Sequence, residues 1–163
     1  MQLVAYGAQD IYLTGNPQIT FFKVVYRRHT NFSMEAIEQT FSGTADFGKK
    51  VTCTISRNGD LISRMYLQVR LPEVSTGSAD GVFKWHSHIG SHLVKEVEVE
   101  IGGQKIDKHY GEWLYIWNEL SQEAGKAQAY ARMVGNVEKL CYPALGTAGK
   151  VPAYTCYVPL QFW

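Results

Sequence analysis

The sequence predicts a mainly β domain, built from antiparallel strands and carrying two short helical insertions. Three observations lead to this fold class. Several segments alternate apolar and polar residues with a period of two, breakers such as glycine and proline separate these segments, and two apolar stripes recur with helical spacing. The chain has 163 residues, which is enough for one domain around one core. The pattern alone does not distinguish a β-sandwich from a β-barrel.

The best-defined unit is a β-hairpin. Residues 97–101 alternate between apolar and charged side chains, so one face of this strand is expected to be half-buried. A Gly-Gly pair follows as a two-residue turn, because glycine tolerates the positive φ angles that such a turn requires. A turn of this length would place Ile101 opposite Gln104 and Val99 opposite Ile106. In that register the apolar residues of the two strands face one another.

Two helices are expected after this hairpin. The first covers residues 112–122 and carries four apolar residues at i, i+3, i+4 and i+7, namely Trp113, Ile116, Trp117 and Leu120. Gly125 breaks the chain, and the second helix has a stripe of the same kind, formed by Ala127, Tyr130, Ala131 and Val134. Trp113 and Trp117 could form a sugar-stacking platform, but their place in an apolar stripe favours packing in a core or at an interface.

Four other segments have the pattern of strands: residues 32–41, 51–55, 61–71 and 154–163. In the first of them the apolar residues change parity, so we expect a β-bulge near Ala36 that brings both sets inward. Residues 19–26 are apolar on all sides and fit either a short helix or a strand.

Two long segments are expected to be loops. Residues 72–91 and 135–152 are rich in glycine and proline, which break regular structure. The first is too long for an ordinary turn, and we expect it to be poorly packed and directed outward.

The composition excludes some classes of function. Lys and Arg total 16 and Asp and Glu total 15, so the chain lacks the basic surplus of a nucleic-acid-binding protein. Cys53, Cys141 and Cys156 are odd in number and have no CxxC spacing, which argues against a disulfide framework or a zinc site. The sequence has neither a signal-peptide pattern nor a stretch as long as a transmembrane helix.

His86, His88 and His92 are the residues most suggestive of a metal site. On a strand they would lie on one face, and HxH is a common pair of metal ligands. A cupin-type site would need a glutamate soon after the second histidine, and this sequence has His92 there. The three histidines also lie in or beside a glycine-rich segment, where no rigid ligand shell is evident. A surface loop is therefore the favoured interpretation.

The acidic residues also have a structural explanation. Glu96, Glu98 and Glu100 alternate with valines, which places them on the outer face of a strand and not in an acid–base pair. Asp107 and Glu112 fit interactions at the start of a helix. The sequence has no nucleophile elbow, P-loop or dinucleotide fingerprint. We therefore expect no catalytic residue, no cofactor-binding residue, no metal ligand and no enzymatic activity.

Three segments resemble the major capsid proteins of the nucleocytoplasmic large DNA viruses, such as phycodnaviruses, iridoviruses and mimivirus. They stand in the family's order and together span nearly the whole chain: LVAYGAQDIYLTGNPQITFFKVVYRRHTNF, TISRNGDLI and KEVEVEIGGQKIDKHYGEWLYIWNEL. The resemblance implies an antiparallel jelly-roll sandwich, the first half of a double jelly roll. Residues 1–30 would then be an N-terminal arm, and residues 31–163 the N-terminal jelly roll without its last two strands.

The resemblance also implies a function. The chain would be a structural subunit of an icosahedral viral capsid that self-assembles into trimeric, pseudo-hexagonal capsomers and needs no cofactor. Its partners would be further copies of itself, neighbouring capsomers and minor capsid proteins, without direct contact to nucleic acid. The N-terminal arm would approach an inner viral membrane, and the virion would be assembled in the host cytoplasm. A carbohydrate-binding jelly-roll module is the alternative function.

Overall fold

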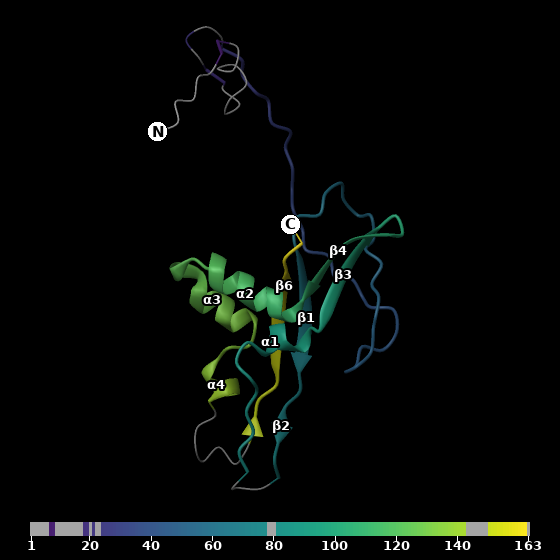
Figure 1. Cartoon of the computed structure of the whole chain (residues 1–163), viewed down its shortest axis with the longest axis vertical. Coiled ribbons are helices and arrows are strands. Elements are labelled where there is room, and N and C mark those ends of the chain that lie inside the picture. Colours follow the sequence, from purple (N-terminus) through teal and green to yellow (C-terminus); the bar gives the residue numbers. More distant parts are fainter. Residues whose placement is uncertain are drawn as a thin grey trace. The chain divides into compact units, whose positions relative to one another are not determined.

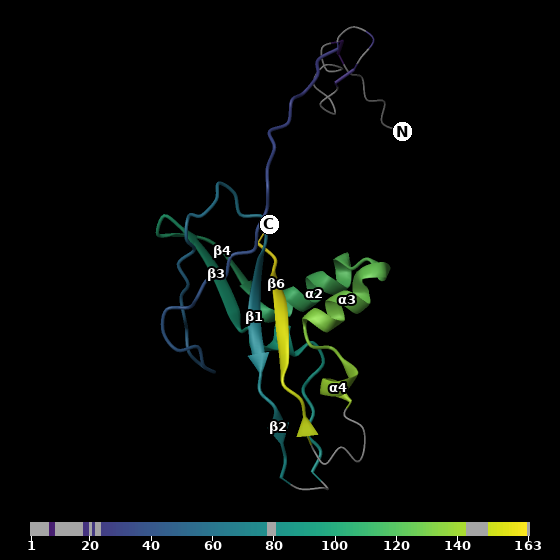
Figure 2. The ribbon, with the colours of Figure 1, turned by 180° about the vertical axis from the view of Figure 1, so that it is seen from behind.

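The computed structural model describes residues 7–8, 18–19, 21, 24–77, 81–142 and 150–162. The chain divides into two compact units, residues 1–57 and residues 58–163, and each is described here by itself. Figure 1 and Figure 2 show the ribbon from two opposite sides.

In the first unit, the described residues form isolated bridges in place of strands. Ser42 pairs with Thr52, and the backbone N–H and hydroxyl of Ser56 both donate hydrogen bonds to the Gln39 side chain. The strands predicted over residues 32–41 and 51–55 are therefore wrong. Their alternating apolar side chains would form a strand face only against a covering layer, and in this unit most of them are exposed.

Residues 19–26 belong to the same unit. Ile19 bridges to Val24 in the antiparallel sense, and the backbone N–H of Val25 donates to the carbonyl of Gln18. The described residues of this segment form neither a helix nor a strand. Residues 20, 22 and 23 lie outside the described part of the chain.

The second unit contains the helices and strands. In chain order they are β1 (Met65–Leu71), β2 (Val74–Ser75), α1 (Ile89–Leu93), β3 (Glu96–Ile101), β4 (Gln104–Tyr110), α2 (Gly111–Ser121), the 3₁₀ turn η2 (Ala124–Lys126), α3 (Ala127–Met133), α4 (Glu138–Cys141), β5 (Lys150–Val151) and β6 (Tyr154–Leu160). All strand pairs are antiparallel and form three two-stranded sheets in the described residues: β1–β6, β2–β5 and β3–β4. The predicted strands over residues 61–71 and 154–163 are thus present with shorter bounds. Both predicted helices are also present, and the first begins and ends one residue earlier than expected.

The core lies on one face of the β1–β6 pair, which crosses the middle of the unit in both views (Figures 1 and 2). Along β1 the odd-numbered residues are less exposed than the even-numbered ones, as the alternation predicts. The buried cluster consists of Leu71, Ile89, Leu140, Cys141, Val151 and Cys156. Leu71 lies on β1 and Cys156 on its partner β6, and the other four residues come from the chain between these two strands. The core therefore holds the first and the last strand of this unit together.

The two predicted long loops contain regular structure. Residues 72–91 include β2 and the start of α1, and Phe83 and Trp85 pack against the core cluster. The backbone N–H of Trp85 donates a hydrogen bond of 2.9 Å to the carbonyl of Leu140. Residues 135–152 include α4 and β5. The expectation of a poorly packed loop is wrong for residues 83–91, because Phe83, Trp85 and Ile89 lie in or against the core. Residues 72–77 are mostly exposed, and residues 78–80 lie outside the described part of the chain.

Helix α1 fits closely against the core. The backbone N–H of Gly90 donates a hydrogen bond of 3.0 Å to the carbonyl of Val134, at the end of α3. A Cβ atom at Gly90 would stand 2.7 Å from a methyl group of Val158 on β6, so only glycine fits here without a shift. This contact positions the histidines on either side of Gly90.

The hairpin β3–β4 has the predicted turn but a different register. Ile101 faces Gln104 as expected, whereas Val99 faces Asp107 because a β-bulge shifts the pairing between Val99 and Glu100. The extra residue in β4 is Ile106, which is 56% exposed. A one-residue bulge changes every later pairing, and a turn sequence does not reveal it.

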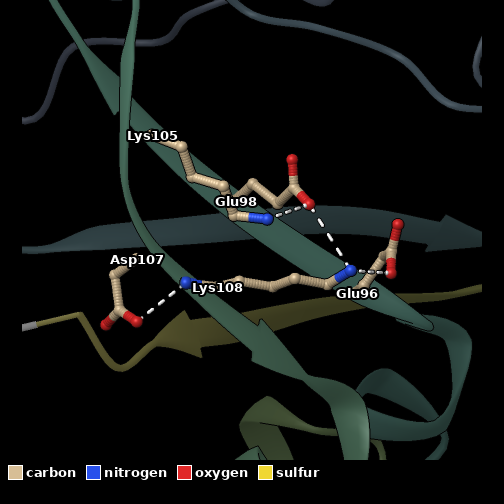
Figure 3. A network of polar contacts seen from close by, with 5 residues as sticks. All are labelled: Glu96, Glu98, Lys105, Asp107 and Lys108. Carbon is tan, nitrogen blue, oxygen red and sulfur yellow. Dashed lines mark hydrogen bonds and ion pairs between the residues drawn. The ribbon is translucent and has the colours of Figure 1, made fainter.

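The outer face of this hairpin carries an ion-pair network, which Figure 3 shows. The Lys108 ammonium lies 2.5 Å from a carboxylate oxygen of Glu96 and 3.4 Å from one of Glu98, and Lys105 lies 2.7 Å from the same Glu98 oxygen. The hydrogen bond from Lys108 lowers the pKa of Glu96, and Glu96 raises the pKa of Lys108. The prediction that these glutamates line a strand's outer face is confirmed.

Candidate functional site

Helix α2 has a buried face and an exposed face. Gly111, Leu114 and Asn118 are buried, at positions i, i+3 and i+7. Gly111 begins the helix against the backbone of Ser91 and Val94, where a Cβ atom would overlap the two carbonyl oxygens. Leu114 is 1% exposed, so the helix is held to the rest of the unit along this stripe.

The exposed face consists of the stripe that the sequence marks as apolar. Trp113 is 39% exposed and Trp117 41%, and the same face includes Ile116 and Leu120, at 48% and 76%. In the described chain this stripe is not part of the core. The buried stripe was missed because it contains Asn118, which weakens its apolar periodicity.

Four rings form an aromatic ladder along this face. The Phe162 and His109 ring centroids are 4.5 Å apart, those of His109 and Trp113 6.4 Å, and those of Trp113 and Trp117 5.6 Å. All three pairs are stacked, with interplanar angles of 30°, 20° and 26°. The ladder therefore links the end of β6, strand β4 and helix α2. No single sequence stripe predicts it, because Phe162 and His109 come from other elements.

The stacking bears on the sugar-binding alternative. A carbohydrate platform presents the faces of aromatic rings side by side to the ligand. Trp113 and Trp117 instead turn faces toward each other, which reduces the ring area available for a sugar. Their mutual contact also limits ring motion, and a rigid apolar surface loses little side-chain entropy when a protein covers it. The geometry favours a protein contact over a glycan.

The three candidate metal ligands lie near one another around α1. His86 and His92 have ring centroids 4.4 Å apart, and Tyr115 of α2 lies 5.2 Å from His88 and 6.4 Å from His92. The Nε2 atom of His88 is 3.4 Å from the Asn136 amide nitrogen. Among the residues that the structure describes, no group of three or more histidine, cysteine, aspartate or glutamate side chains could hold a metal ion.

The remaining candidate groups make local contacts. The Asp107 carboxylate accepts a hydrogen bond from the Lys108 backbone N–H and lies 3.4 Å from the His109 ring, while Glu112 stands in the first turn of α2. Burial raises the pKa of the Cys156 thiol to about 11, so this free cysteine is a poor nucleophile at neutral pH. Within the described residues, no helix is long and apolar enough to cross a membrane.

The family is established by comparison with known proteins. A model of the family described as "Major capsid protein N-terminus" matches residues 20–163. The chain is 61% identical over 165 residues to the major capsid protein of Pyramimonas orientalis virus, and 52% identical over 184 residues to that of Phaeocystis pouchetii virus. Both alignments include the whole chain, which spans 39% and 35% of the length of these relatives.

The fold is similar to that of a solved capsid protein. The crystal structure of PBCV-1 VP54, fitted into a reconstruction of the virophage Sputnik, superposes with a TM-score of 0.65 and 38% sequence identity. The superposition covers 88% of this chain and 32% of that protein, and a quasi-atomic model of the PBCV-1 virus capsid gives the same values. This match confirms the predicted jelly-roll class, and the chain belongs to the family of the N-terminal part of the viral major capsid proteins.

Proposed function

We propose that this chain is the N-terminal jelly-roll part of a structural capsid subunit of a large DNA virus. The observation that carries the proposal is the family match over residues 20–163, together with the likeness to a capsid protein of known structure. Because the relatives are about two and a half to three times as long as the matched region, the proposed subunit is a longer, double jelly-roll protein. In it, residues 1–30 form an arm and residues 31–163 the first jelly roll.

The proposed subunit is not an enzyme and assembles with copies of itself. Trimeric, pseudo-hexagonal capsomers are its proposed form, located in the virion and assembled in the host cytoplasm. Minor capsid proteins are further proposed partners, and the N-terminal arm lies toward an inner membrane. The exposed face of α2 supports self-assembly, because exposed tryptophans in an apolar stripe are typical of protein contacts. We assign this face to the contact between subunits.

The test uses a chimera in which this chain is followed by the part of the Pyramimonas orientalis virus protein beyond the matched region. Light scattering during size-exclusion chromatography is expected to give three times the mass of one chain. Replacing Trp113 and Trp117 with serine is expected to shift the chimera toward the monomer, because it removes the aromatic anchors of the contact.

A matched control separates loss of contact from loss of folding. Tyr66 of β1 is 48% exposed, close to the exposure of the two tryptophans, and Tyr66→Ser is expected to leave the trimer intact. A chimera that remains monomeric at high concentration contradicts trimer assembly. A trimer that survives both tryptophan substitutions contradicts the assignment of the α2 face but leaves the capsid function standing.

A further inference from the structure

The histidines around α1 form a cluster that the proposed capsid function does not use. We name His86, His88 and His92 the histidine cluster. They belong to the segment 86–93, in which two histidines precede α1 and one lies within it. The three ionisable rings lie close together in sequence and in space.

The first structural observation is the mutual proximity of these rings. His86 and His92 are in edge-to-face contact, with centroids 4.4 Å apart and an interplanar angle of 79°. Tyr115 connects the pair to His88, since its ring contacts both His88 and His92. Because the rings are this close, a positive charge on His86 or His92 disfavours a positive charge on His88.

The second observation is the position of His88. It precedes α1 in a left-handed conformation, with φ at 56°, and is the one non-glycine residue with positive φ in the described chain. Its ring is half-buried between Tyr115 and Asn136. Burial lowers the pKa of His88, the charges of His92 and His86 lower it further, and Glu119 of α2 opposes these effects.

The third observation is that this segment holds α1 in place. The Gly90 N–H donates to the Val134 carbonyl, and the Gly90 backbone abuts Val158 of β6. The other groups around the cluster are Tyr130 of α3, whose pKa is raised by burial, and the Cys141 thiol of α4, 3.9 Å from the His86 carbonyl. A change in charge at the histidines therefore acts on the close contact of α1 with β6 and the end of α3.

We propose that residues 86–93 form an acid-sensitive latch, which holds α1 against β6 and the end of α3 at neutral pH and releases it when the histidine cluster is protonated. The direction follows from linkage. Because the pKa of His88 is below its ordinary value of 6.5 in the closed state, the open state binds more protons at mildly acidic pH. The contribution of His88 to the stability of the closed state is complete above pH 6.5. It is lost as the pH drops toward the pKa that His88 has in the closed state.

The experiment is hydrogen–deuterium exchange of the full chain at pH 7.5 and 5.5, corrected for the intrinsic pH dependence of exchange. Peptides covering residues 86–93 are compared with peptides covering β1 and β6. Each extra proton bound by the open state raises the opening constant by at most about tenfold per pH unit. Since His88 begins to bind its proton in the open state only near pH 6.5, we expect residues 86–93 to open up to about tenfold more at the lower pH relative to β1 and β6.

Variants without the ionisable rings test whether the histidines cause the acid response. His88→Asn suits the left-handed conformation, since asparagine adopts it readily, and it is combined with His86→Gln and His92→Gln. The triple variant is expected to lose the acid response, and the His86→Gln, His92→Gln double variant to show a smaller one. His29→Gln, an exposed histidine in the first unit, is the matched control and is expected to respond like the unmodified chain. Unchanged opening of residues 86–93 between the two pH values, or an undiminished response in both variants, overturns the proposal.

Discussion

At the scale of single residues, His88 shows how burial and neighbouring charges compete. Burial is the largest effect on its pKa and lowers it, while Glu119 raises it and His92 lowers it. Replacing His92 with glutamine is therefore expected to raise the pKa of His88, and replacing Glu119 with glutamine to lower it. Proton NMR titration of the His88 ring measures both changes. Shifts of the same sign in the two variants would contradict the arrangement of charges around this residue.

Gly111 gives a second prediction at this scale. A methyl group there would overlap the carbonyl oxygens of Val94 and Ser91, which belong to the backbone and cannot rotate away. Gly111→Ala is expected to destabilise the fold by about 1–3 kcal/mol, the usual cost of overpacking. Gly125→Ala is the control, because a Cβ atom there has no neighbour within 4 Å, and surface changes usually stay within about 0.5 kcal/mol. Urea denaturation measures the free energy of unfolding of both variants. Equal effects would contradict the close approach of the start of α2 to the end of α1.

Single residues also show what sequence patterns leave undetermined. The pairing of Ile101 with Gln104 was predictable, because a two-residue turn fixes it. The pairing of Val99 was not, because the bulge at Ile106 depends on how the hairpin is covered and not on the turn. The role of Gly90 was also hidden, since its neighbours Val134 and Val158 lie far along the chain.

At the scale of elements, α2 is the clearest case of a helix that was predicted correctly while the face that it buries was missed. Its existence followed from the apolar stripe that begins at Trp113, yet the buried stripe is the one that includes Leu114. A helix with apolar residues on two faces can pack against two different surfaces. Periodicity alone does not show which of the two faces packs against the same chain. The aromatic ladder was beyond prediction for a related reason, because three elements contribute to it.

Two leucines on α2 test this orientation directly. Leu114 is 1% exposed and Leu120 is 76% exposed. Leu114→Ala is expected to destabilise the chain by about 2–5 kcal/mol, because it removes buried methyl groups and leaves a cavity. Leu120→Ala is expected to change stability by less than about 0.5 kcal/mol. Thermal unfolding of the two variants measures the difference. A larger effect for Leu120 than for Leu114 would mean that the helix presents its other face to the core.

Elements in the first unit show where periodicity fails. Val51, Cys53 and Ile55 alternate with threonine and serine, as in a strand, and the structure has a bridge there at Thr52. An alternating segment becomes a strand when neighbouring strands satisfy its backbone and a layer covers its apolar face. The alternation of apolar and polar residues shows that a segment can form a strand. Whether the strand forms depends on the neighbouring strands and on the layer that covers it.

At the scale of the whole molecule, large apolar side chains are exposed in both units of the described chain. The large exposed side chains include Phe32, Leu61, Trp117 and Leu120. Exposed apolar area from many large side chains is typical of surfaces that other protein covers, which agrees with a chain that spans 35–39% of its relatives' length.

The last prediction follows from this area. The chain alone is expected to bind a fluorescent hydrophobic dye strongly, because burying apolar surface is worth about 25 cal/mol per Å² and the dye gains part of it. The chimera with the remainder of the Pyramimonas orientalis virus protein is expected to bind less dye per molecule, since added protein covers part of the same surface. Dye titration of both proteins at equal molar concentration measures the difference, with a compact monomer of similar mass as the reference. Dye binding by the chain no stronger than by that reference would show that its apolar side chains are covered within the chain itself. In that case the exposed apolar side chains would no longer support the α2 face as a contact surface. Membership of the capsid family would not be affected, because it rests on the sequence match.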